Sequence, residues 1–215
     1  MALKVTSEVG NRTLMADEVR VPGWTEERFF AEAPEQGFYE LKDGKLIMHS
    51  PVNVEHQRIA GFLATLLDCF VTERNRGEVF EGPGVLKLRD ALLREPDIFV
   101  VSSERAAQIG KQYVRAPVEL VIEIVSPESV ERDLVDKRAE YDEAGIEEYW
   151  AVDFDDEKIT VHTRPDGNFH TREIVDGTLK SRALSGFSIE VDWLWQRPLP
   201  NRMECVRKIL KKSED

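Results

Sequence analysis

The sequence predicts an α/β fold in which a central mixed sheet is flanked by helices. Between residues 53 and 153, the hydrophobic pattern gives a helix, three strands, a second helix and a fourth strand, in that order. A β-hairpin pattern precedes this segment and a β-meander pattern follows it. The 215 residues show no break in composition. We therefore expect a loose lead-in over 1–21, one domain over 22–195 and a C-terminal tail over 196–215.

The first elements are predicted from caps and turn residues. Thr25 is suited to cap a helix over 26–33, and Pro34 signals the end of that helix. The segment FYELKDGKLIMHS then reads as two strands joined by a tight turn at Asp43-Gly44.

The clearest helix follows this hairpin. Ser50 can cap it, and Pro51 suits its first turn. Its apolar residues are three or four positions apart and form one face, which consists of Ile59, Leu63, Leu66 and Phe70.

The remaining elements are predicted from apolar runs and the turn residues that bound them. We expect a bent or broken strand over 78–89, strands over 96–101, 119–125 and 148–153, a helix over 129–144 ending at Gly145, and a β-meander over 157–191. The tail MECVRKILKK is predicted to form a short amphipathic helix or a frayed end.

The overall charge argues against a protein whose main task is to hold nucleic acid. The chain has 29 basic and 41 acidic residues, a net charge of −12, whereas nucleic-acid-binding proteins usually present a basic surface. An enzyme with one local basic groove is still compatible with this balance. Nine basic side chains of the core segment could line such a groove: Arg58, Arg74, Arg76, Lys87, Arg89, Lys111, Arg115, Arg132 and Arg138.

Other features of the composition concern the compartment. Cys69 and Cys205 are the two cysteines, and they stand far apart without the spacing of a zinc site. No apolar run approaches the roughly 20 residues that a membrane helix needs. The start MALKVTSEVG lacks the apolar stretch of a secretory signal. We therefore expect a cytoplasmic protein with no membrane partner.

Three charged side chains stand where the pattern calls for apolar residues. In LVIEIVS, Glu123 interrupts a strand that is apolar on both faces, where a carboxylate is costly unless it is paired or binds a metal. In REPDIFVV, Asp97 opens an apolar strand in the same way. Lys137 falls on the inward face of the helix over 129–144, from which it can reach toward Glu123.

His56 is a fourth unusual residue, at the start of the apolar face of its helix. The helix dipole disfavours an imidazolium near a helix N-terminus, so we expect a neutral imidazole that forms a hydrogen bond or binds a metal.

Two carboxylates and a lysine in one cleft suit the hydrolysis of a phosphate ester. The carboxylates would hold Mg²⁺ or Mn²⁺, and the lysine would orient or activate a water or stabilise negative charge on the phosphate. Structural explanations stay open for the same residues: Asp97 as a turn cap, Glu123 with Lys137 as a buried ion pair, and His56 as a structural histidine. Tyr141 and Trp150 are interpreted as core aromatics.

These residues resemble the Uma-two family of restriction-endonuclease-like proteins, a branch of the PD-(D/E)XK nuclease superfamily. The resemblance covers about residues 22–190. It is carried by YELKDGKLIMHSP, EHQRI, EPDIFVV, LVIEIVSPES, AGIEEYWAVD and the spacing of Asp133, Lys137 and Tyr141. Because the predicted order of elements agrees with the superfamily core, the resemblance implies a restriction-endonuclease-like fold.

The resemblance also implies a divalent-metal-dependent phosphodiesterase site. Asp97 and Glu123 match the family's acidic residues and would ligate Mg²⁺ or Mn²⁺, with the backbone carbonyl of Ile124 as a third ligand. The superfamily often has a lysine two residues after the glutamate, a position held here by Val125. Lys137 resembles the relocated equivalent of that lysine.

Two further residues match the family's site. His56 matches a histidine at the first core helix. Glu40 matches an acidic position in the hairpin, where it could instead pair across strands with a lysine.

We therefore expect an endonuclease that hydrolyses phosphodiester bonds of DNA by a metal-activated water. A homodimer is expected, because the β-meander adds sheet edges that must be covered. The alternative is a catalytically silent nuclease-fold dimer that acts as a binding module, with Glu123 and Lys137 as a structural pair. A weaker option is a hydrolase of small phosphate esters at the same metal site.

Overall fold

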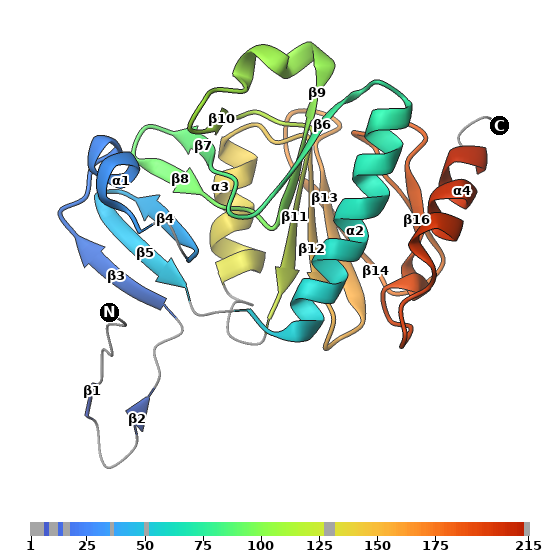
Figure 1. The fold of residues 1–215 in the computed structure, drawn as a ribbon, viewed down its shortest axis with the longest axis horizontal. Helices are drawn as coiled ribbons and strands as arrows, with labels where there is room; N and C mark the ends of the chain where they lie inside the picture. The colour runs from blue at the N-terminus through green and yellow to red at the C-terminus, as the bar shows by residue number, and fades with distance from the viewer. Residues whose placement is uncertain are drawn as a thin grey trace.

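A computed structural model describes residues 7–8, 13–14, 18–34, 37–49, 52–126 and 132–212 (Figure 1). The described residues contain two six-stranded sheets, and the one with the longer strands is called the larger sheet. It contains, in order, β14 (His170–Ile174), β13 (Lys158–Thr163), β12 (Glu148–Asp153), β11 (Leu120–Val125), β9 (Ile98–Ser102) and β6 (Gly77–Glu81). Strands β11 and β12 run parallel, and the other neighbours are antiparallel. The expected mixed sheet is therefore present.

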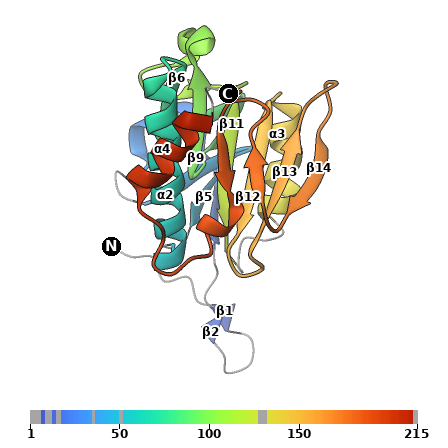
Figure 2. The ribbon, with the colours of Figure 1, turned by 90° about the vertical axis from the view of Figure 1, so that its right-hand side faces the viewer.

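Helices α2 (Val54–Glu73) and α3 (Arg138–Glu143) lie on opposite faces of this sheet (Figures 1 and 2). Alternate residues of β11 serve the two faces. Ile122 belongs to the core beneath α2, whereas Val121 and Val125 belong to the core that contains Tyr141 of α3. Glu123 shares the parity of Val121 and Val125, so its side chain points toward α3.

The apolar face predicted for α2 is confirmed, since its four residues are at most 1% exposed. The helix begins later than expected, because the Asn53 side chain accepts a hydrogen bond from the His56 amide and acts as the N-cap. Ser50 and Pro51, the predicted cap and first-turn residue, lie outside the described residues.

A smaller sheet lies beside the α3 face and contains, in order, β10 (Val114–Arg115), β7 (Leu86–Arg89), β8 (Leu92–Arg94), β4 (Tyr39–Lys42), β5 (Lys45–His49) and β3 (Glu18–Pro22). The predicted hairpin is β4–β5, and Asp43 and Gly44 both have positive φ, which is typical of a type I′ turn. Helix α1 (Glu26–Glu32) has the predicted Thr25 cap and buries Phe29 against this sheet.

Three segments are arranged in a way that the sequence did not fully predict. The segment 78–89 is broken at Gly82-Pro83-Gly84, which is one of the two predicted forms, but its halves β6 and β7 belong to different sheets. Pro83 has no N–H for a ladder, so a continuous strand is disfavoured there. The meander is also split: β13 and β14 extend the larger sheet, whereas β15 (Thr178–Lys180) and β16 (Ser188–Glu190) pair as a separate sheet.

The third difference concerns the lead-in. Residues 18–22 form β3 and pair with β5 instead of remaining irregular, while β1 (Ser7–Glu8) and β2 (Thr13–Leu14) pair with each other. Their sequence lacks a strong period, so pairing with the hairpin determines the conformation of β3.

The C-terminal tail forms helix α4 (Arg202–Lys212), the helical alternative of the prediction. Cys205, Val206 and Ile209 are buried in the same core as α2. Short 3₁₀ turns cover Ser103–Gln108 and Val191–Trp193. No helix in the described ranges is long and apolar enough to cross a membrane.

Candidate active site

Glu123 is the buried carboxylate at the centre of the candidate site. Its side chain lies on β11 with the residue 3% exposed. Its Oε1 atom lies 2.8 Å from Lys137 Nζ and accepts a 2.5 Å hydrogen bond from the Tyr141 hydroxyl. Burial raises the pKa of the Glu123 carboxyl to about 7; the Lys137 ammonium opposes this rise, whereas the nearby Asp97 and Asp133 carboxylates increase it.

Lys137 reaches Glu123 as its position on the helix predicted. The helix expected over 129–144 starts, in its described part, with a π-helical turn over Arg132–Lys137 before α3; residues 129–131 lie outside the described part. Such turns are rare and often occur at functional sites. Here, Asp133 and Lys137 are four residues apart, with Nζ 3.5 Å from Oδ1.

The electrostatic surroundings keep Lys137 charged. Burial opposes the charge of this ammonium, but Glu123, Glu40 and Asp133 together raise its pKa above the usual value. The raised pKa favours the protonated form of Lys137, a cation that can orient a water or stabilise negative charge.

Asp97 lies directly before β9 and connects that strand to β11. Its Oδ2 atom accepts a 2.7 Å hydrogen bond from the Ile124 amide and lies 3.1 Å from His56 Nε2. This carboxylate therefore bonds to a strand 27 residues later in the chain, rather than to a local turn. The contact brings Asp97 beside Ile124, the neighbour of Glu123 in sequence.

The expectation of a neutral His56 is not supported. Burial lowers the pKa of this imidazole, but the hydrogen bond and charge of Asp97, with Glu123 and Asp133 farther off, raise it above the usual value. The carboxylates therefore outweigh the effect of burial on this pKa. The Nδ1 atom is buried without a hydrogen-bond partner in the described residues.

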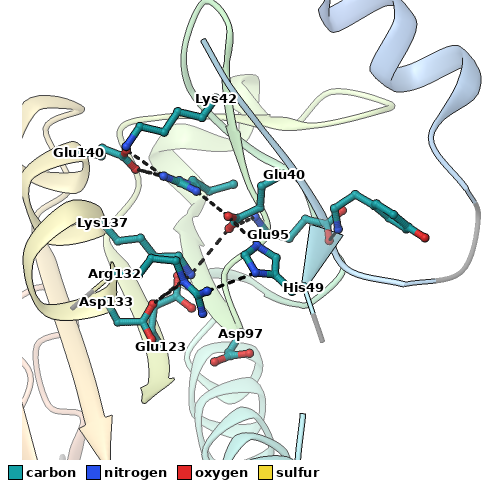
Figure 3. A network of polar contacts seen from close by, with 12 residues as sticks. Glu40, Lys42, His49, Glu95, Asp97, Glu123, Arg132, Asp133, Lys137 and Glu140 are labelled. Carbon is teal, nitrogen blue, oxygen red and sulfur yellow. Dashed lines mark hydrogen bonds and ion pairs between the residues drawn. The ribbon is translucent and has the colours of Figure 1, made fainter. Parts of the chain in front are cut away.

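Glu40 lies in a network of charges between the smaller sheet and α3 (Figure 3). It is 1% exposed and faces Arg94 at 2.5 Å, His49 at 2.9 Å and Lys137 at 3.7 Å. Burial alone would raise the pKa of Glu40, but Arg94, Lys137 and His49 hold it well below its usual range. Within the described residues, Glu40 therefore pairs with Arg94, His49 and Lys137, and not with a lysine across the hairpin.

Several residues of this network were not identified from the sequence. Arg94 is 1% exposed and forms two 2.8 Å hydrogen bonds with Glu140, which also pairs with Lys42 at 2.8 Å. Asp133 is 2% exposed, and its Oδ1 atom accepts no hydrogen bond in the described part of the chain. Its spacing of four residues from Lys137 was the available signal, whereas no local pattern marks Arg94.

Glu95 and Tyr141 also have surroundings that the sequence did not predict. Burial raises the pKa of Glu95 to about 8, while its Oε2 atom accepts a hydrogen bond from the Tyr39 amide. Tyr141 is fully buried, as expected for a core aromatic, but its hydroxyl is part of the site through Glu123. The hydroxyl faces the site because α3 packs against the Glu123 face of β11.

Asp97 and Glu123 are the candidate carboxylate ligands of a metal ion. Within the described ranges, no group of three or more His, Cys, Asp or Glu side chains is arranged to hold one. Mg²⁺ commonly uses only one or two carboxylates and keeps several waters. The hydrogen bonds from the Ile124 amide and the Tyr141 hydroxyl go to Asp97 Oδ2 and Glu123 Oε1, and the pKa of Glu123 is raised first by burial and then by the Asp97 and Asp133 carboxylates. Two such carboxylates fit Mg²⁺ or Mn²⁺ with a shell completed by water.

Several of the basic side chains that could line one groove pair with acidic neighbours. Arg58 pairs with Glu55, Lys87 with Glu26 and Asp90, and Arg89 with Asp43. Arg74 and Arg76 follow the C-terminal end of α2, and Arg74 is 18 residues, or about 27 Å along the helix, from His56. These five side chains therefore do not gather around His56 and Asp97.

Comparisons with known proteins concern the fold and the family of the chain. A crystal structure described as a "putative nuclease belonging to DUF820" from Anabaena variabilis superposes with a TM-score of 0.66. It is 17% identical and covers 80% of this chain and 97% of its own chain, so it confirms the α/β fold with a central mixed sheet flanked by helices. Among curated proteins no match was found. The model of the Uma2 family, described as "Putative restriction endonuclease", matches residues 26–192. Since this match covers most of the chain, the protein belongs to the Uma2 family.

Proposed function

We propose that this protein is a divalent-metal-dependent endonuclease that hydrolyses phosphodiester bonds of DNA. The observation that carries the proposal is the convergence of two carboxylates and one lysine from three separate elements. Asp97 precedes β9, Glu123 lies on β11, and Lys137 contacts Glu123 at 2.8 Å from the helical segment that follows. The family description and the nuclease-like fold support the same reaction class.

In this proposal Asp97 and Glu123 hold Mg²⁺ or Mn²⁺. When bound, such an ion acts as a Lewis acid toward a phosphoryl oxygen and lowers the pKa of water. Lys137, kept protonated by its carboxylate neighbours, orients the attacking water and stabilises the negative charge on the phosphate. His56 holds Asp97 through its Nε2 contact, and Tyr141 holds Glu123 through its hydroxyl. The Glu40 carboxylate, 3.7 Å from Lys137 Nζ, adds to the negative charge that keeps this ammonium protonated.

The first test combines metal binding with DNA cleavage. Calorimetry with Mn²⁺ is expected to show binding by the wild type and at least tenfold weaker binding by Asp97→Ala and Glu123→Ala. Supercoiled plasmid and single-stranded DNA are then incubated with Mg²⁺ or Mn²⁺. Both variants are expected to lose cleavage while keeping the wild-type circular dichroism spectrum.

Glu119→Gln is the matched control, because Glu119 precedes the same strand but pairs with Arg105 at 2.8 Å, away from the site. It is expected to bind Mn²⁺ and cleave like the wild type. Cleavage that survives in folded Glu123→Ala would contradict the assigned site.

A catalytically silent binding module is the second candidate function. The extreme burial of Glu123 and Lys137, which are 3% and 4% exposed, favours it, because a structural ion pair would look the same. Here Glu123→Ala is expected to destabilise the fold by about 3–5 kcal/mol, with no Mn²⁺ binding by the wild type. Mn²⁺ binding that depends on both carboxylates would exclude this candidate.

We also propose that the protein forms a homodimer. The outer strands β14 and β6 each pair with one neighbour in the described sheet, which leaves one edge of each available for another chain. Sedimentation equilibrium is expected to give twice the chain mass of 24.6 kDa. A monomer at all accessible concentrations would refute this proposal.

A further inference from the structure

Arg94 is the fully buried cation that the proposed reaction does not use. It lies at the end of β8 in the smaller sheet, with 1% of the residue exposed. A buried guanidinium is costly unless several acceptors surround it. Arg94 has two carboxylate partners, Glu40 at 2.5 Å and Glu140 in a forked contact of two 2.8 Å hydrogen bonds.

Glu40 is shared between Arg94 and Lys137. Its Oε2 atom lies 2.5 Å from the guanidinium, whereas its Oε1 atom lies 3.7 Å from Lys137 Nζ. The same Nζ atom lies only 2.8 Å from Glu123. Asp133 Oδ1 lies 3.5 Å from the same atom, so three buried carboxylates surround one ammonium, and Lys137 is closest to Glu123 (Figure 3).

We infer that Arg94 is a positioning residue which satisfies Glu40 and thereby leaves Lys137 to contact Glu123. Without the guanidinium, Glu40 would be a buried anion whose nearest remaining strong cation is Lys137. Attraction between unit charges rises steeply at short range in a medium of low dielectric constant. The ammonium would then move toward Glu40 and away from Glu123.

Arg94 could also act mechanically, because Glu140 lies on α3 three residues after Lys137. The forked contact ties this helix to β8, and Lys42 joins the tie at 2.8 Å. The two effects are separable, since charge balance depends on Glu40 whereas the tie depends on Glu140. We assign the position of Lys137 to the charge balance between Arg94 and Glu40, and not to the tie through Glu140.

The test uses three variants and crystal structures of each. In Arg94→Met, the Lys137 Nζ–Glu123 distance is expected to exceed 3.5 Å, with Glu40 becoming the nearer carboxylate. In Arg94→Met/Glu40→Gln, the buried charge is balanced again, and Lys137 is expected to return to within about 3 Å of Glu123. Glu140→Gln removes the tie alone and is expected to leave Lys137 at its wild-type position.

Kinetics give a second readout that rests on the proposed function. A displacement of about 1 Å in a catalytic cation can cost about 10²-fold in rate, so kcat of Arg94→Met should fall by that factor with KM within threefold. The double variant should recover at least tenfold of this loss, which a merely structural role of Arg94 would not allow. If neither the wild type nor any variant cleaves DNA, the Lys137–Glu123 distances in the crystal structures still test the role of Arg94.

Two results would overturn the inference. One is Lys137 remaining at 2.8 Å from Glu123 in Arg94→Met. The other is a double variant in which Lys137 still leaves Glu123. If Arg94→Met alone does not fold, the double variant decides, because restored charge balance must then restore both folding and the Lys137–Glu123 contact.

Discussion

Replacing Lys137 with methionine is expected to lower the free energy of unfolding by about 3–5 kcal/mol. The ammonium lies 2.8 Å from Glu123, 3.5 Å from Asp133 and 3.7 Å from Glu40, with a side chain 6% exposed. At an effective dielectric constant of about 20, the Glu123 contact alone corresponds to about 6 kcal/mol of attraction. Part of this loss is offset, because methionine needs no desolvation and because Glu123, with a pKa of about 7, can take up a proton.

Lys42→Met is the matched control for this experiment. Lys42 Nζ also lies 2.8 Å from a carboxylate, that of Glu140, but its side chain is 30% exposed. An ion pair of the same length that is more exposed to solvent should therefore contribute less than about 1 kcal/mol to the free energy of unfolding. Both values are measured by urea denaturation at neutral pH, with the slope of the transition checked against the wild type.

Two outcomes would contradict the expected difference between the two lysines. Equal losses for the two lysines would show that burial does not set the energy of these contacts. A loss below about 1 kcal/mol for Lys137→Met would show that the three carboxylates do not depend on its charge.

Three further predictions concern groups around and beyond the site. Tyr141→Phe removes the hydroxyl that donates to Glu123 and should cost about 1.5–3 kcal/mol in urea denaturation; an unchanged midpoint would contradict the hydrogen bond. His162 is 3% exposed, and burial and Arg138 lower its pKa from 6.5 to about 4. The unfolded chain therefore binds more protons between these pH values, and stability should fall by about 3 kcal/mol as pH drops from 6.5 to 4. His162→Phe should lack this component, and identical pH profiles for the two proteins would refute it. Glu148→Gln weakens a fully buried carboxylate that accepts four hydrogen bonds, and should cost about 2–3 kcal/mol without changing Mn²⁺ binding.

Local sequence was sufficient for most helices and strands of the core. The apolar spacing of α2, the turn at Asp43-Gly44 and the apolar run of β11 each depend on interactions within a few residues. The same information identified Glu123 and Lys137, because a charge within an apolar pattern is visible without any knowledge of the fold. Their contact followed from the usual packing of a crossover helix against its sheet.

Tertiary structure decided the features that depend on partners distant in the chain. The break at Gly82-Pro83-Gly84 sends β6 and β7 to different sheets, which depends on where each finds hydrogen-bonding neighbours. The pKa of His56 is raised rather than lowered because Asp97, 41 residues later, lies 3.1 Å away.

The role of Arg94 likewise has no local signal. Its carboxylate partners Glu40 and Glu140 are 54 and 46 residues away in the chain. Local patterns in the sequence therefore identified Glu123 and Lys137 and the elements that carry them, but not the burial of Arg94. Which charges face one another depends on the tertiary structure, because electrostatic energy depends on distances in space that separation along the chain does not fix.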